Sequence, residues 1–101
     1  MLELRATCEH CHRALPPAST EAMICSFECT FCRDCVGLLH NVCPNCGGGF
    51  TPRPIRPVHD FNNRNILDRY PATTKITYKP VNLSAHAGLT AGIAAIPPEQ
   101  R

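Results

Sequence analysis

The sequence predicts a small metal-stabilised domain, built from a short hairpin and one short helix and followed by a largely irregular C-terminal tail. Two observations lead to this prediction. All eight cysteines of the 101-residue chain lie in its first half, at Cys8, Cys11, Cys25, Cys29, Cys32, Cys35, Cys43 and Cys46. A head of about 50 residues also buries too little apolar surface to fold securely without disulfides, metal or a partner.

The spacing of the cysteines favours metal over disulfide bonds. They form four close pairs, each separated by only two or three residues. Two cysteines at this spacing can place both sulfurs on one ion, and four such sulfurs complete a tetrahedral zinc site with Zn–S bonds of about 2.3 Å. We therefore predict two structural Zn²⁺ ions per chain.

The expected cellular compartment supports the same interpretation. The opening Met1–Arg5 is charged and does not resemble a signal peptide, and no stretch approaches the roughly 18 apolar residues of a membrane helix. A cytoplasmic location is therefore expected, where paired cysteines bind metal rather than form disulfides. Structural zinc contributes roughly 10–16 kcal/mol per site. A whole domain is stable by only about 5–15 kcal/mol, so metal should decide whether the head folds.

The elements of the head are expected in the following order. Residues 1–7 suggest a short strand, and residues 12–22 form a loop because Pro16 and Pro17 end regular structure. Residues 23–31 predict a short hairpin around the cysteines. Residues 34–40 predict a short helix with Asp34 in its first turn. Its inner face would carry Val36, Leu39 and His40, and the glycines after Cys46 would allow a tight turn.

The composition changes after Phe50, which places the boundary between a module at 1–50 and a flexible tail at 51–101. Prolines alternate with Arg53 and Arg56 and favour an extended chain. Residues 73–78 have the composition of a strand but no obvious partner, and residues 85–96 are rich in Ala and Gly with little pattern. The tail is expected to contribute at most one marginal strand or helix.

Two groupings of the four cysteine pairs are compatible with the spacing. In a sequential scheme, the first two pairs hold one ion and the last two pairs hold the other. In a cross-brace, the pairs alternate. Only two residues separate Cys29 from Cys32, and such a short link can still turn the chain between two sites.

The order and gaps of the cysteines resemble a RING finger over residues 8–46, with a short helix after the sixth ligand and Cys43-Pro44-Asn45-Cys46 at the end. The resemblance implies a RING-like or treble-clef module with cross-brace pairing. Site 1 would then consist of Cys8, Cys11, Cys32 and Cys35, and site 2 of Cys25, Cys29, Cys43 and Cys46.

The resemblance to RING-type ubiquitin ligases is incomplete. Cys29 replaces the usual histidine at the fourth ligand, His10 replaces an apolar residue before the second, and Gly47 replaces a basic residue after the last. These departures remove most of the contacts that such a ligase makes with its conjugating enzyme.

A second resemblance covers roughly residues 1–50. Met1–Arg5, the stretch at 24–32 (ICSFECTFC) and the stretch at 43–48 (CPNCGG) are similar to a family of short, cysteine-rich bacterial proteins of unknown function. That resemblance implies no activity.

Charge distinguishes between the possible partners. The head carries three arginines against five acidic residues, and eight thiolates with two Zn²⁺ would bring its formal charge to −6. The tail carries seven basic residues against three acidic ones. An acidic head is a poor match for nucleic acid, although Arg53, Arg56 and Arg64 of the tail offer dispersed phosphate contacts. A nucleic-acid-binding regulator is therefore the alternative rather than the favoured function.

The favoured function is a non-enzymatic platform for binding another protein. Closed four-cysteine sites leave no open position for substrate, and all eight thiols are used, so that neither zinc catalysis nor a redox role is expected. His10 and His12 are expected in the loop, and His40 on a face of the helix, rather than as ligands. Candidate contact residues are Phe27, Phe31, Leu38 and Leu39, of which at least half should be buried in the core.

Overall fold

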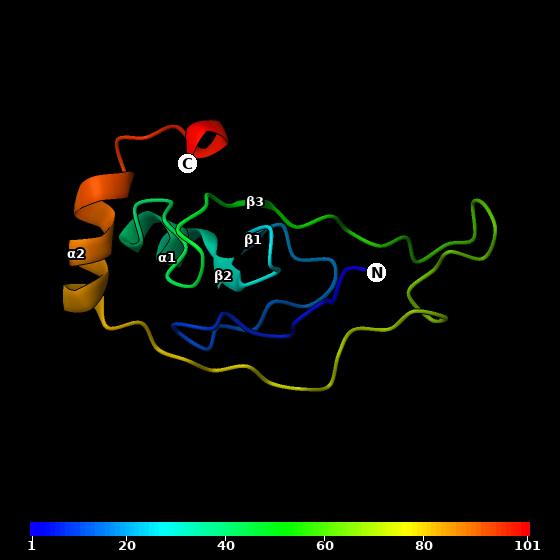
Figure 1. The fold of residues 1–101 in the computed structure, drawn as a ribbon. Helices are drawn as coiled ribbons and strands as arrows, with labels where there is room; N and C mark the ends of the chain where they lie inside the picture. The colour runs from blue at the N-terminus through cyan, green and yellow to red at the C-terminus, as the bar shows by residue number, and fades with distance from the viewer.

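A short antiparallel hairpin forms the centre of the fold (Figure 1). In the computed structural model, which describes residues 1–101, β1 (Ala22–Ile24) pairs with β2 (Thr30–Cys32), and Met23 lies opposite Phe31. All three residues of β2 are buried. The loop between the strands turns at Glu28, which has a left-handed φ of 66°. The hairpin expected over residues 23–31 is therefore confirmed.

A third strand extends the sheet on its other side. The two-residue strand β3 (Thr51–Pro52) pairs with β1, and the strand order is β2-β1-β3. Pro52 is tolerated because β3 is an edge strand, where a missing N–H breaks no ladder on the open side. The sheet thus continues two residues beyond the expected boundary at residue 50, and the division into a module and a flexible tail remains a prediction.

The expected short helix is present directly after β2. Helix α1 (Arg33–Leu38) carries Asp34 in its first turn and buries Cys35. It ends before His40 and Asn41, which have left-handed φ angles of 53° and 56°. His40 lies beyond the end of the helix and is exposed, so the expectation that it belongs to the inner face of the helix is wrong.

The core combines the cysteines with a few apolar side chains. The Phe31 and Phe50 rings meet edge to face, with centroids 5.4 Å apart. Leu15 and Leu39 are fully buried beside them, and Val36 packs against this cluster while remaining partly exposed. Six of the eleven residues in the buried cluster are cysteines: Cys8, Cys25, Cys29, Cys32, Cys35 and Cys43. So small an apolar core agrees with a fold that depends on its thiols.

The tail returns along the head rather than leading away from it (Figure 1). After β3 the chain forms a long loop and then runs beside the N-terminal segment, where Thr73 N donates to Leu4 O over 3.1 Å and Lys79 N donates to Glu9 O over 2.9 Å. No strand forms over residues 73–78. The strand expected over residues 1–7 is also absent, since that segment makes only a single bridge between Thr7 and Ala14. Isolated hydrogen bonds replace a ladder in both places.

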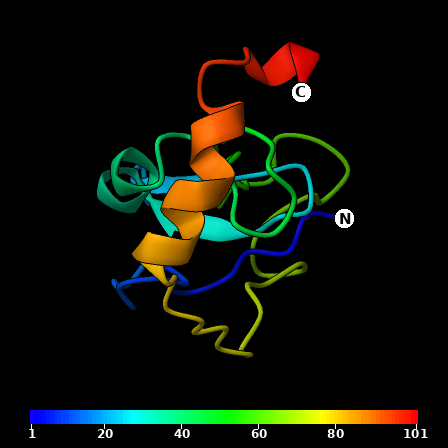
Figure 2. The same ribbon diagram turned by 60° about the vertical axis from the view of Figure 1, so that its left-hand side comes forward.

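The tail also contributes one helix, α2 (Leu83–Ile93), followed by a short 3-10 turn at Pro98–Gln100. The Asn82 side chain caps α2 by accepting a hydrogen bond from Ala85 N over 3.1 Å. Figure 2 shows α2 in front of the head, and its contact there is with the loop that follows α1, where His86 Nε2 lies 2.7 Å from Val42 O. Only His86 and Thr90 of this helix are buried. Neither α1 nor α2 has the length and apolar composition that a membrane-spanning helix requires.

Arginine side chains attach the tail to the head through main-chain carbonyls. Arg53 is buried and donates to Arg5 O at 2.8 Å, to Pro16 O at 3.1 Å and to Leu15 O at 3.2 Å. Arg56 likewise donates to Leu2 O. Burial lowers the pKa of the Arg53 guanidinium. Arg53 is therefore not one of the dispersed phosphate contacts expected of the tail, because its guanidinium donors are satisfied inside the fold.

Candidate metal centre

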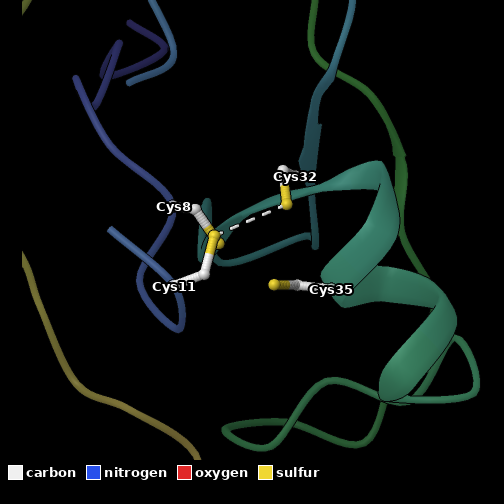
Figure 3. Close-up of side chains that lie close together, drawn as sticks. All are labelled: Cys8, Cys11, Cys32 and Cys35. Carbon is white, nitrogen blue, oxygen red and sulfur yellow. Dashed lines mark hydrogen bonds between the residues drawn. The ribbon is translucent and has the colours of Figure 1, made fainter. Parts of the chain in front are cut away.

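Four sulfurs from three separate segments meet at the first cysteine group. The Sγ atoms of Cys8, Cys11, Cys32 and Cys35 all lie within 4.8 Å of one another. Figure 3 shows the four side chains converging, with Cys8 and Cys11 on the N-terminal loop, Cys32 at the end of β2 and Cys35 on α1. The hairpin and helix therefore bring the third close pair against the first.

Hydrogen bonds hold the N-terminal loop in the shape that this group needs. Cys8 N donates to Arg13 O over 2.8 Å, and His12 N donates to Cys8 O over 3.0 Å. His12 takes a left-handed φ of 66°, which turns the chain back directly after Cys11. Both sulfurs of the pair consequently face the same point.

Glu9 attaches this loop to β2, a role that its sequence position does not reveal. Its N–H donates to Thr30 O over 3.0 Å, and its buried carboxylate accepts from Thr30 N. The same carboxylate accepts from Arg5 Nη1 over 3.0 Å. Glu9 is thus the counter-charge for Arg5 and fixes the first cysteine pair relative to the strand that ends at Cys32.

The sulfur spacing fits a tetrahedral metal ion better than a disulfide. A tetrahedron with metal–sulfur bonds of about 2.3 Å has edges of about 3.8 Å. The Cys11 and Cys32 Sγ atoms are 3.8 Å apart. A disulfide requires about 2.05 Å, and all eight cysteines are free thiols. The donor set of the first group therefore suits an ion such as Zn²⁺.

The second group contains three sulfurs that are as close to one another as the sulfurs of the first group. The Sγ atoms of Cys25, Cys43 and Cys46 lie within 4.8 Å of one another, and Cys29 lies outside that limit. Cys29 is nevertheless buried beside Cys25, whose N–H donates to Cys29 O over 3.2 Å. Burial, followed by the Cys25 thiol, raises the pKa of Cys29. The structure thus brings together three of the four residues predicted for site 2 and leaves Cys29 beside them.

The chain turns tightly around the last cysteine pair. Gly47 N donates to Cys43 O and Cys43 N donates to Gly48 O, each over 2.8 Å. Gly47 has a φ of 76°, a conformation that glycine adopts without strain. A Cβ on Gly48 would stand 3.3 Å from Cys46 Sγ. Both glycines therefore serve the turn for which the sequence suggested them.

Main-chain amides donate to the sulfurs of the second group. Phe27 N lies 3.3 Å from Cys25 Sγ, and Asn45 N lies 3.4 Å from Cys43 Sγ. Gly48 N lies 3.4 Å from Cys46 Sγ. Such donors stabilise thiolate charge, as in the outer shell of metal sites.

Burial, main-chain amides and neighbouring thiols together leave the thiols of each group with unequal acidities. Burial is the largest influence on the Cys8 and Cys25 thiols and opposes ionisation, but the surrounding amides outweigh it and lower the pKa of both. Burial raises the pKa of Cys35 and of Cys43 strongly, and neighbouring thiols add to the effect. A bound divalent cation would allow all the thiols of a group to ionise, because it compensates the charge that several adjacent thiolates create.

The distances group the cysteine pairs alternately along the chain. Cys8 and Cys11 lie with Cys32 and Cys35, whereas Cys25 lies with the pair at Cys43 and Cys46. A sequential arrangement would have placed Cys25 with Cys8 and Cys11. The proximity is that of a cross-brace, and ligation of two ions by all eight sulfurs remains a prediction.

The histidines beside Cys11 have other contacts. His10 Nδ1 accepts a hydrogen bond from Val81 N over 2.9 Å, which connects the first cysteine loop to the tail. The His12 ring packs against Tyr78 with centroids 4.8 Å apart. Both contacts involve residues about 70 positions away, so nothing in the local sequence indicates them.

Comparisons with known proteins agree with a cysteine-rich family. Residues 1–56 match the family described as "Protein of unknown function (DUF1272)". The chain is 51% identical over 81 residues to "Uncharacterized protein R02474" of Rhizobium meliloti (strain 1021), an alignment that covers 79% of this chain and 89% of that protein. No solved structure matches the chain.

Proposed function

This chain belongs to the DUF1272 family, and we propose that its head is a structural zinc-binding module that serves as a platform for another protein. The first cysteine group is the observation that supports this proposal most directly. Its four sulfurs surround one point and leave no open position for water or substrate, which is the arrangement of structural rather than catalytic zinc. We accordingly propose a non-enzymatic role.

Zinc is the proposed metal because the donors are all sulfur. Tetrahedral four-sulfur sites hold zinc or iron, and the two are distinguished by composition and colour. Elemental analysis of the purified protein should return two zinc ions per chain and no iron. A single zinc ion would remove the second site from the proposal, and a visible charge-transfer spectrum with bound iron would overturn the choice of metal.

The dependence of the fold on metal is tested by chelation. Treatment with a strong chelator under reducing conditions should abolish the cooperative unfolding transition and collapse the dispersed amide NMR spectrum, and added Zn²⁺ should restore both. A reduced sample without chelator is the control. An unchanged unfolding midpoint after complete metal removal would contradict a metal-supported head.

Exposed apolar side chains support the platform role. Phe27 is 67% exposed and Leu38 is 54% exposed, whereas Phe31 and Leu39 are buried in the core. The two exposed residues flank the cysteine groups, since Phe27 lies in the loop between Cys25 and Cys29 and Leu38 ends α1. Aromatic residues are enriched at protein–protein interfaces, so the exposed Phe27 side chain supports the platform role more than Leu38 does.

The platform role is tested by affinity capture with the zinc-loaded full chain, followed by measurement of direct binding to each captured protein. Phe27→Ser and Leu38→Ser should weaken a specific complex without changing zinc content, while Val58→Ser, an exposed apolar residue of the tail loop, serves as the matched control. Salt-sensitive binding of a labelled oligonucleotide, with no protein complex, would favour the nucleic-acid-binding alternative.

A further inference from the structure

A groove of about 640 Å³ lies where the returning tail meets the cysteine loops. Phe27, Pro44 and Asn45 line it from the two loops of the second cysteine group. The tail lines it with residues of the segment 75–82 and with Ala85 and Leu89 of α2. The groove is therefore formed jointly by the metal-binding half and the tail.

Apolar side chains reach the groove from both sides. Phe27 is largely exposed in the hairpin loop, and Leu89 of α2 is 38% exposed. The main chain at Phe27 is held by the cysteine loop, because its N–H donates to Cys25 Sγ. The groove can consequently accept apolar groups of a ligand between the cysteine loop and α2, which His86 attaches to Val42 O.

The free charges in the groove are all positive. Lys75 and Lys79 are the only two lysines of the chain, and both line the groove, are exposed and have no carboxylate within ion-pairing distance. The Glu9 carboxylate, which also lines it, is buried and already bound by Arg5 and Thr30 N. A ligand entering the groove thus meets apolar surface and two uncompensated ammonium groups.

We propose that this groove binds a peptide segment of a partner protein that carries apolar side chains together with carboxylates. The proposal rests on the platform function above; it specifies the part of the platform surface that includes Phe27 and the chemistry of the partner. Charge complementarity favours an acidic peptide over nucleic acid. Two lysines can pair with a few carboxylates, whereas a continuous phosphate backbone would extend beyond them onto a head whose formal charge is −6 when loaded with two Zn²⁺.

A peptide selection tests the proposal before any partner has been identified. The zinc-loaded full chain is used to select from a phage-displayed random-peptide library, and the selected sequences should combine Asp or Glu with Leu, Ile or aromatic residues. Fluorescence anisotropy then measures binding of one selected peptide and of the same peptide with Glu and Asp replaced by their amides. The amide version should bind about tenfold more weakly.

Charge reversal at the groove provides the matching test on the protein. The double variant Lys75→Glu/Lys79→Glu should weaken the selected peptide by at least about tenfold and retain two zinc ions, whereas Arg64→Glu in the exposed loop should stay within about twofold of the parent. Bound peptide should also protect both lysines from acetylation, which mass spectrometry detects.

The outcomes separate the groove from the platform. A selected peptide whose affinity does not change in the double variant, or a selection dominated by basic or neutral sequences, would overturn the groove while leaving a platform that uses another surface. Failure to enrich any sequence would also overturn it. Binding of labelled oligothymidylate that is lost in the double variant would assign the lysines to nucleic acid and overturn both proposals.

Discussion

His86 Nε2 on α2 lies 2.7 Å from the main-chain carbonyl oxygen of Val42, the residue that precedes Cys43. A carbonyl only accepts, so Nε2 carries the proton of this bond. The Thr90 hydroxyl lies 3.1 Å from the other ring nitrogen and 2.8 Å from His86 O. A buried histidine whose nitrogens both have partners thus docks the tail helix onto the loop that enters the second cysteine group.

Loss of this histidine should release α2 from the head. His86→Ala leaves the buried Val42 carbonyl without a partner, which costs about 1–3 kcal/mol of unfolding free energy. Denaturant unfolding of the zinc-loaded protein measures the loss, and hydrogen exchange should show faster exchange confined to α2. His59→Ala, in the exposed loop, is the control. Equal stability of the two variants would show that the bond contributes nothing.

Arg53 is expected to matter more than its place in a Pro-rich segment suggests. Arg53→Met removes donors to three main-chain carbonyls and should lower the unfolding free energy by about 2–4 kcal/mol. Arg53→Lys keeps a charge but cannot reproduce the planar donor geometry, so it should recover only part of the loss. Arg64→Met is the matched control, and an Arg53→Met protein as stable as that control would refute the role.

Cys29 is expected to complete the second site, although it lies outside the three-sulfur group. Cys29→Ser should reduce bound zinc from two ions to one, as Cys46→Ser should, while Ser26→Ala in the same loop retains both. Elemental analysis of the three variants measures the difference. If the Cys29→Ser protein retains two zinc ions, the protein supplies only three sulfurs to the second site.

Zinc affinity should fall as the pH falls. Burial raises the pKa of Cys35 and Cys43 above that of a free thiol, so each group contains a thiol that holds its proton at neutral pH and must release it to bind the ion. Competition with a chromogenic chelator between about pH 6 and pH 8 should show tighter binding at the higher pH. Calorimetry in buffers of different ionisation enthalpy should show proton release. An affinity that does not change with pH would contradict this.

The hairpin and the first helix could be predicted because their signals are local. The spacing of the cysteines, the apolar residues of 23–31 and the acidic start at Asp34 each lie within a few residues of the element that they specify. Spacing alone does not decide the alternating grouping of the sulfurs, which only the RING resemblance implies. The distances within the first group match that grouping.

The attachment of the tail could not be predicted, because it depends on contacts far apart in sequence. Arg53 resembles any solvated arginine among prolines, and His86 lies in an Ala- and Gly-rich stretch without apolar periodicity. Val81 meets His10 across 71 positions. A weak signal for α2 was present, since Asn82 stands at the N-cap position before Leu83.

The alternation of the cysteine groups along the chain has a consequence for synthesis on the ribosome. With the proposed metal ligation, the first site can be completed only after Cys35 has left the ribosome, and the second only after Cys46. Once Cys25 has emerged, and until Cys35 follows, a nascent chain therefore carries two unfinished sets of thiols at once. During that interval, sulfurs from different groups are available to bind one ion together. All of these thiols are also exposed to oxidants and to other metals.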